Sequence, residues 1–273
     1  MIFSVSMWTP ILRLSLFLAR RALRSFGVVP LPAVFIMGHM RSGSTLLLHI
    51  LMTHPEIIGC GERNTPYRSS IDLDKLEIAS RVARRAPFRP VRYAIDQINH
   101  DKFTPNADLL GDERLRCIFL IREPKATIES IVNLSRTYYE PWTVQRAVDY
   151  YSQRLQTLAE YATRLGSGNE VLGLTYNDLI ADTSSALRRL ESFLRLSGTL
   201  REQYMIQSFT GRRGDPSQNI HVGHIVRLPS QPPVEIPHRE LKRALQAYDA
   251  CARALNLEPS ACNSGESPPS ARI

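Results

Sequence analysis

Cysteine is scarce and scattered in this chain of 273 residues. There is no C-x-x-C pair, and no histidine stands at zinc-like spacing from a cysteine. His221 and His224 form an H-x-x-H pair, which without a third ligand is a weak metal signal. We therefore expect no metal site and no disulfide framework, but reduced, mostly buried thiols in a cytoplasmic protein. The four cysteines are Cys60, Cys117, Cys251 and Cys262.

A long uninterrupted apolar run is also missing. A membrane-spanning helix needs about 20 such residues, and Arg13 breaks the N-terminal candidate. Residues 1–27 also lack the charged leader and cleavage site of a signal peptide. Thr9 and Pro10 are typical of a helix start, so we predict a basic amphipathic helix in residues 1–27. Either residues 9–26 lie peripherally on an acidic membrane surface, or the helix packs on its own domain.

Acidic residues are fewer than basic ones, with 26 Asp+Glu against 34 Lys+Arg and a formal net charge of +8. A basic surface suits nucleotides, sulfated or phosphorylated substrates or acidic lipid, and it is equally consistent with a solvated face. The sequence has no nucleic-acid recognition motif and little interleaving of aromatic and basic residues. We therefore expect no nucleic-acid partner.

What the chain does contain is an alternation of β-rich apolar blocks with helical patterns, which predicts a three-layer α/β fold around about five parallel strands. The main domain is expected over residues 28–258, followed by a disordered tail at 259–273. Residues 208–237 have no clear period and are expected to form a functional loop. Strands are expected at 33–38, 56–60, 92–98, 116–123 and 170–176. Helices are expected from Thr45 to Met52, at 71–86 with a surface-facing character, from Pro124, at 142–165, around 187–194 and at 239–257.

The most informative segment is VFIMGHMRSGSTLLLHIL, residues 34–51. From Gly38 to Thr45 it fits the phosphate-binding pattern G-x-x-x-x-G-K-[ST], except that Ser44 replaces the lysine. A strand, a glycine-bearing turn and a helix N-terminus form an anion site, because backbone N–H groups and the helix dipole point at the ligand. The alternative is a tight turn that needs Gly43 only for its backbone.

Two arginines replace the features that support metal and ATP. Arg41 is the cation of the loop, and its planar group can hold phosphate or sulfate oxygens through two hydrogen bonds. Arg122 stands at the end of a buried strand, where an ATPase places an aspartate for Mg²⁺. This pattern favours a ligand with two separate anionic groups and no metal.

Four segments carry a resemblance to a known family. The chain resembles the sulfotransferases that use 3′-phosphoadenosine 5′-phosphosulfate (PAPS), in the branch of the carbohydrate and tyrosylprotein sulfotransferases and their bacterial relatives. The segments are RSGST (41–45), IREPKATIES (121–130), LTYNDLIADTSSALRRLESFLRL (174–196) and, more weakly, GRRGD (211–215).

The resemblance implies a role for each matching residue in binding PAPS and its product, 3′-phosphoadenosine 5′-phosphate (PAP). The 5′-phosphosulfate loop is Arg41, Ser42, Gly43, Ser44 and Thr45. The 3′-phosphate is expected at Arg122 and Ser130, under a basic loop with Arg212 and Arg213. Tyr176 is expected to approach the adenine.

The resemblance also implies a glutamate base in a G-E segment, which here is Glu62 in CGERNTPY. Such a base would take the proton of the acceptor hydroxyl. An ordinary surface carboxylate, or a partner of Arg63, is the alternative, and His39 is the competing catalytic candidate. Gln97 stands where many relatives have a lysine near the transferring group, so either Lys102 reaches in, Arg41 suffices, or activity is weak.

The sequence thus predicts a transferase that moves a sulfuryl group from PAPS to a hydroxyl of a sugar, a phenol or a lipid-like alcohol. Residues 63–90 and 208–237 are expected to shape the acceptor pocket. One alternative is a divergent phosphate-loop kinase that depends on Mg²⁺ and ATP. The other is a non-catalytic nucleotide-binding protein at a membrane surface, motivated by Gln97 and the basic N-terminal helix.

Overall fold

The computed structural model describes residues 30–85, 89–166, 171–212, 214–227 and 232–258, together with six helical residues at 15, 18, 19, 21, 22 and 25. Most of the predicted N-terminal helix, the predicted disordered tail and Cys262 lie outside these residues. No helix in the described ranges combines the length and the apolar character needed to cross a bilayer. Cys60, Cys117 and Cys251 are buried thiols outside any disulfide, as predicted for three of the four cysteines.

A sheet of five parallel strands forms the centre of the molecule, in the order β2-β3-β1-β4-β5. The sequence predicted all five, with deviations only at their ends. All six residues of β1 and of β3 are buried, since both faces of the sheet are covered, and this explains the continuous apolar character of β1. The strands are β1 (Ala33–Gly38), β2 (Ile57–Gly59), β3 (Tyr93–Ile98), β4 (Leu115–Ile121) and β5 (Val171–Thr175).

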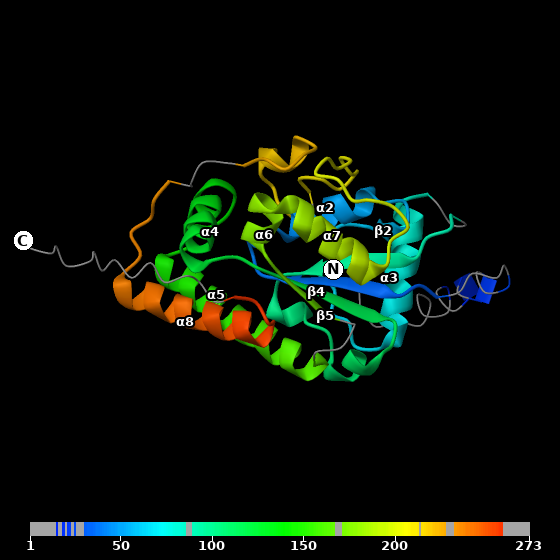
Figure 1. Ribbon diagram of the computed structural model, residues 1–273, viewed down its shortest axis with the longest axis horizontal. Coiled ribbons are helices and arrows are strands. Elements are labelled where there is room, and N and C mark those ends of the chain that lie inside the picture. The colour runs from blue at the N-terminus through cyan, green and yellow to red at the C-terminus, as the bar shows by residue number, and fades with distance from the viewer. Residues whose placement is uncertain are drawn as a thin grey trace, which may run out of the picture.

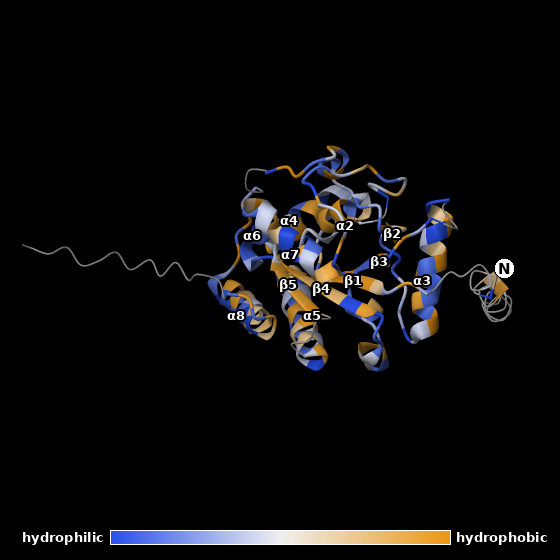
Figure 2. Ribbon diagram, turned by 45° about the vertical axis from the view of Figure 1, so that its right-hand side comes forward, coloured by the Kyte–Doolittle hydropathy of each residue, from blue (hydrophilic) through white to orange (hydrophobic). Residues whose placement is uncertain are grey.

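Helices cover the two faces of the sheet and make a three-layer fold, as predicted (Figure 1). Along β1, Val34 and Ile36 join one core, whereas Phe35 and Met37 join the other. Figure 2 shows the hydrophobic strands between the two helical layers. The first core takes residues of α2 (Ser44–Thr53), α6 (Tyr176–Ala181) and α7 (Thr183–Leu194). The second takes residues of α3 (Ser70–Ala83), α4 (Pro124–Tyr138), α5 (Val144–Leu165) and α8 (His238–Ala254).

Local sequence signals fix several of these boundaries. Pro124 is the first residue of α4, and the Thr143 hydroxyl accepts from the backbone N–H of Arg146 at 3.2 Å to cap α5. The segment predicted as a loop at 208–237 contains the short 3-10 helix η3 (Gln218–His221), and two others lie before β4, η1 (Asp101–Phe103) and η2 (Ala107–Gly111).

Helix α3 corrects one expectation. The arginine-rich segment at 71–86 was predicted to face the surface, but the side chain of Arg81 is only 5 % exposed and pairs with Glu77 at 2.8 Å. The carboxylate of Glu77 also accepts from the backbone N–H of Leu31 at 2.9 Å. Burial of this arginine is tolerated because its charge is paired.

All five strands run in the same direction, so their carboxyl ends meet at one edge of the sheet. The phosphate-like loop follows β1, Asn99 follows β3, Arg122 follows β4 and Tyr176 follows β5. Glu62 stands shortly after β2. Open parallel sheets bind ligands at this edge.

Candidate functional site

The loop between β1 and α2 has the backbone geometry of an anion cradle. Gly43 caps α2 with φ of 92°, a left-handed conformation that favours glycine. A Cβ at Gly43 would lie 2.7 Å from the Tyr176 ring, so the glycine also lets this aromatic side chain approach the loop. Ser44 and Thr45 occupy the first turn of α2, where backbone N–H groups have no intrahelical acceptor and can bind an anion.

Arg41 extends from this loop between two side chains that lie far away in the sequence. Its Nε donates to the Ser130 hydroxyl at 2.9 Å, and its Nη1 lies 2.7 Å from Oδ1 of Asp215. The backbone N–H of Asp215 donates to the Thr45 hydroxyl at 3.2 Å. The carboxylate of Asp215 therefore pairs with Arg41, the positively charged side chain of the anion-binding loop.

Arg122 lies on the other side of the loop. Its guanidinium stacks over the Tyr176 ring at 4.2 Å and donates through Nη1 to the carbonyl of Arg41 at 3.3 Å. Its buried Nε has no hydrogen-bond partner, and within the described residues no carboxylate lies at ion-pair distance from Arg122. Burial, and the charge of nearby Arg41, lower the pKa of Arg122. An anionic ligand would relieve both costs.

Glu62 faces the same space from the neighbouring strand end. Oε1 accepts from the Asn99 amide at 3.2 Å and Oε2 from the Gln97 amide at 3.3 Å. Burial raises the pKa of Glu62, and these two hydrogen bonds oppose the shift. A carboxylate with a raised pKa is a stronger base than an exposed one.

His39 has a different environment from the one expected of a base. It is fully buried, its Nε2 accepts from the backbone N–H of Arg122 at 3.0 Å, and its Nδ1 lies 2.9 Å from the Met40 carbonyl. Nδ1 therefore carries the proton and donates to that carbonyl. Burial lowers the pKa of His39 to about 3. Both ring nitrogens are thus engaged by backbone groups of the loop and of the end of β4.

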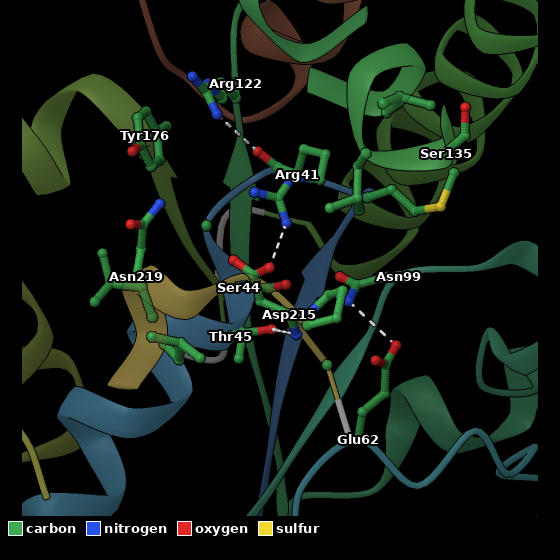
Figure 3. A pocket seen from close by; sticks show the side chains of 18 of the residues that line it. Arg41, Ser44, Thr45, Glu62, Asn99, Arg122, Ser135, Tyr176, Asp215 and Asn219 are labelled. Atoms are coloured by element: carbon green, nitrogen blue, oxygen red, sulfur yellow. Dashed lines mark hydrogen bonds and ion pairs between the residues drawn. The ribbon is translucent and has the colours of Figure 1, made fainter. Parts of the chain in front are cut away.

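A pocket of about 630 Å³ joins these groups. Figure 3 shows Arg41, Ser44 and Asp215 at its centre, Tyr176 and Asn219 on one side, and Glu62, Asn99 and Ser135 on the other. His39, Ser42 and Ser130 are buried behind the lining, and Arg213 lies outside the described residues. The predicted site residues in the lining are Arg41, Gly43, Ser44, Thr45, Glu62, Arg122, Tyr176 and Arg212.

Two segments were expected to shape the acceptor pocket. The segment around 212–226 lines the pocket described here, but of the described residues between 63 and 90 only Asn64 is in the lining. The second half of α4 and the turn after it line the pocket instead, with Leu134, Tyr139 and Trp142. Their apolar spacing in the sequence is indistinguishable from that of ordinary core residues.

Gln97 and Lys102 differ in whether they contact the site. The Gln97 amide donates to the Thr45 hydroxyl at 3.2 Å as well as to Glu62, and thus links the loop to the carboxylate. Lys102 lies on η1 with its Nζ 4.8 Å from the centre of the Phe103 ring and is not part of the lining. Gln97 therefore contacts the site, and Lys102 does not replace the lysine that many relatives have.

Sequence reasoning missed Asp215, although the GRRGD segment that contains it was noted. It also missed Tyr150, Tyr151 and Arg154 on α5. Arg154 had a usable signal, because it follows Tyr151 by one helical turn on the face that packs against the sheet. A fully buried arginine there indicates a bonded group rather than a solvated one.

Taken together, the strand ends bring Arg41, Arg122 and the partly buried carboxylate of Glu62 to one pocket of an open parallel α/β sheet. Among the described residues no group of three or more His, Cys, Asp or Glu side chains is arranged to hold a metal ion. The profile of the sulfotransferase family matches residues 32–108 and 113–199, more than half of the chain. The chain belongs to the sulfotransferase family and is a sulfotransferase enzyme.

Solved structures extend this comparison. The sulfotransferase domain of the Synechococcus PCC 7002 olefin synthase is 20% identical with a TM-score of 0.51, covering 84% of this chain and 96% of that one. A sulfotransferase from Alicyclobacillus acidocaldarius is 15% identical with a TM-score of 0.47, over 84% and 98%. Mouse sulfotransferase SULT7A1 complexed with PAP is 15% identical with a TM-score of 0.44, over 61% and 58%. No curated protein matches the chain.

Proposed function

We propose that the chain transfers a sulfuryl group from PAPS to a hydroxyl group of a small-molecule, glycan or lipid acceptor, without a metal ion. The observation that carries this proposal is Arg122. It is a largely buried guanidinium without a carboxylate partner among the described residues, placed close to a second arginine and to the N-terminus of α2. Such a charge cluster favours a ligand with separated anionic groups over a neutral one.

The residues present fit this donor. Arg41 and the first N–H groups of α2 would hold the 5′-phosphosulfate, with Ser42, Gly43, Ser44 and Thr45 shaping the loop. Arg122 would bind the 3′-phosphate with the orphaned Nε and stack on Tyr176, whose ring would also contact the adenine. Arg212 lies in the lining and, with Arg213, would add positive charge. Ser130 contributes through Arg41, to which its hydroxyl is bonded.

The chemistry assigned to this chain is general-base catalysis. Glu62 would accept the proton of the acceptor hydroxyl as that oxygen attacks sulfur, and the oxygen of the 5′-phosphate would leave on the opposite side. Arg41 would stabilise the charge that develops on the leaving oxygens. Asn99 and Gln97 hold the carboxylate of Glu62 by both oxygens. His39 supports Arg122 from behind rather than acting as the base.

The family membership favours this reading over a kinase. The non-catalytic alternative rested on Gln97 and on the basic N-terminal helix, and Gln97 donates a hydrogen bond to Glu62, the proposed base. A peripheral membrane contact through residues 9–26 stays a prediction, since most of that segment is outside the described residues.

Calorimetric titration with PAP in the presence of EDTA tests the donor site, with ATP and the 2′-phosphate isomer as competitors. We expect PAP to bind without metal and more tightly than either competitor. Arg122→Ala should weaken PAP binding at least ~10-fold, the lower range for a hydrogen bond to a charged group. The matched control is Arg136→Ala, an exposed arginine of α4. No binding, or binding only of ATP with Mg²⁺, would contradict the proposal.

A further inference from the structure

One part of the pocket, here called the arm, contains Glu62, Asn99 and Ser135 and has no role in the proposed binding of PAPS. In Figure 3, Glu62, Asn99 and Ser135 lie on the side of Arg41 opposite to Tyr176 and Asn219. The donor assignment uses the Tyr176 side and the centre. The Glu62 side is therefore free for the acceptor, and its lining indicates what that acceptor is.

One wall of this arm is aromatic. The Tyr150 ring lies between His100 and Trp142, with ring centres 5.9 and 5.8 Å apart. Both of these neighbours line the pocket. The Tyr150 hydroxyl donates to the Asn99 carbonyl at 2.7 Å, and the Asn99 amide donates to Glu62 at 3.2 Å. The aromatic wall is thus joined to the carboxylate by consecutive hydrogen bonds.

Trp142 is held in a defined position. Its backbone N–H donates to the Ser135 hydroxyl at 2.8 Å, and the guanidinium of Arg146 stacks over its ring at 4.3 Å. Ile131 and Leu134 of α4 complete the apolar lining on this side. Because the tryptophan is anchored from two directions, it presents a preformed flat surface rather than an adaptable one.

The charged residues of the arm also restrict the charge that an acceptor can have. Among the described lining residues the arginines are Arg41, Arg122 and Arg212, and none comes from α4, from the turn after it or from the segment after β3. Burial, followed by the charges of Arg154 and Lys102, lowers the pKa of His100, which keeps its ring neutral at pH 7. Glu62 and Glu140 are the acidic lining residues near this wall, and Glu140 lies 3.9 Å from the Arg146 guanidinium that stacks over Trp142. Glu62, which has no such cation beside it among the described ion pairs, would repel the carboxylate of an acceptor whose hydroxyl points at it.

We infer that this arm binds the ring of an uncharged or cationic phenol or aryl alcohol, with its hydroxyl directed at Glu62. This inference rests on the proposed function and narrows its acceptor class. In the transfer, the bond between the acceptor oxygen and sulfur forms while the bond between sulfur and the 5′-phosphate oxygen breaks. The acceptor proton goes to Glu62, and PAP leaves with the electron pair on its phosphate oxygen.

The test measures calorimetric binding of 2-naphthol to the protein saturated with PAP, and sulfation of four acceptors with PAPS. The acceptors are 2-naphthol, tyramine, 4-hydroxybenzoate and N-acetylglucosamine. We expect kcat/KM for the first two to exceed that for the last two at least ~10-fold. Trp142→Ala should weaken 2-naphthol binding about 10-fold, the size of an aromatic contact plus lost apolar burial, with PAP affinity unchanged.

Two variants keep this result specific. Trp142→Phe should restore most of the binding, and Tyr138→Ala, an exposed aromatic residue outside the lining, should leave it unchanged. Preference for the sugar or the carboxylate, or 2-naphthol binding that is absent or indifferent to Trp142, would overturn the inference. PAP binding separates the two failures: if PAP binds and the sugar is sulfated, only the acceptor class is wrong, whereas absent PAP binding removes the proposed function itself.

Discussion

At the scale of single residues, the two arginines of the site differ in whether a carboxylate neutralises their charge. Arg41 has Asp215, whereas Arg122 has only an aromatic ring and a carbonyl oxygen among the described residues. Glu62 is partly buried and accepts hydrogen bonds from two amides. The proposed donor supplies the missing negative charge, and the acceptor hydroxyl supplies the proton.

Glu62→Gln tests the base directly. The amide keeps the size of the side chain but cannot accept the proton, so we expect kcat to fall at least ~10²-fold, the lower range for a general base. PAP affinity should change little, because Glu62 lies away from the arginines of the donor side. Steady-state kinetics and calorimetry measure the two effects, with Glu160→Gln on α5 as control. Near-normal turnover would remove Glu62 from this role.

Asp215→Asn tests the carboxylate that contacts Arg41. Burial raises the pKa of Asp215, but the charge and hydrogen bond of Arg41 outweigh it and lower the pKa overall, so the group is ionised at pH 7. It competes with an anionic ligand for Arg41. We expect the variant to bind PAP roughly 10-fold more tightly, because a like charge is removed from the site.

The matched control is Asp112→Asn, whose carboxylate pairs with Arg114 before β4, at the other end of the sheet. Calorimetric dissociation constants for PAP decide the question. Weaker binding by the Asp215 variant would mean that this carboxylate positions Arg41 instead of competing for it.

At the scale of elements, α5 holds the strand ends together. Arg154 donates to the carbonyls of Gly38 at 2.8 Å and Ile98 at 2.7 Å, at the ends of β1 and β3. Tyr150 accepts from the Met40 N–H at 2.8 Å and donates to the Asn99 carbonyl. Tyr151 donates to the Arg122 carbonyl at 2.6 Å. One helix thereby fixes the loop, the partner of the base and the second arginine.

Tyr150→Phe isolates this positioning effect. The ring and its aromatic contacts stay, while the hydroxyl that bridges the two loops is lost. We expect kcat/KM to fall about 10-fold or more, with a loss of unfolding free energy of only about 1–3 kcal/mol, the cost of an unsatisfied buried group. Tyr161→Phe on the same helix removes a hydroxyl without a hydrogen bond among the described residues. Equal effects of the two variants on kcat/KM would contradict the positioning role.

At the scale of the whole molecule, Asp96 on β3 couples the fold to pH. It is 1% exposed and accepts from the Tyr67 hydroxyl at 2.6 Å and from the backbone N–H of Arg63 at 3.2 Å. Burial raises its pKa to about 7, against the opposing effects of Tyr67 and Arg63. The protonated form is thus favoured in the folded state. Its contribution to stability is greatest below the unfolded pKa of 3.8 and falls as pH rises to about 7.

Asp96→Asn should flatten this dependence. Between pH 4 and 7 the unfolding free energy of the parent should fall relative to the variant by on the order of a few kcal/mol, since one pKa unit is about 1.4 kcal/mol. Denaturant unfolding of both proteins across this range measures the difference. His39 has the opposite sign, because its lowered pKa costs stability as pH falls below 6.5, and it cancels in the comparison. A difference independent of pH would contradict the assignment.

The sequence by itself determined the sheet and the anion cradle. Strands such as 33–38 and 116–123 can be recognised in the sequence because burial on both faces requires a continuous apolar run. The turn at Gly43 and the helix start at Ser44 can be recognised because each depends on only a few neighbouring residues. Arg41, Arg122 and Tyr176 follow strand ends, so a parallel sheet brings them to one edge as soon as its strands are recognised.

Only the tertiary structure decided how these groups are engaged. The contacts of Arg41 with Asp215, of Tyr150 with both loops and of His39 with Arg122 join residues far apart in the sequence. Their distances depend on strand register and on the packing of α5, and no local pattern encodes either. For the same reason the sequence does not distinguish Trp142 from the other apolar residues. Only the fold shows that its ring lies in the aromatic wall beside the proposed base.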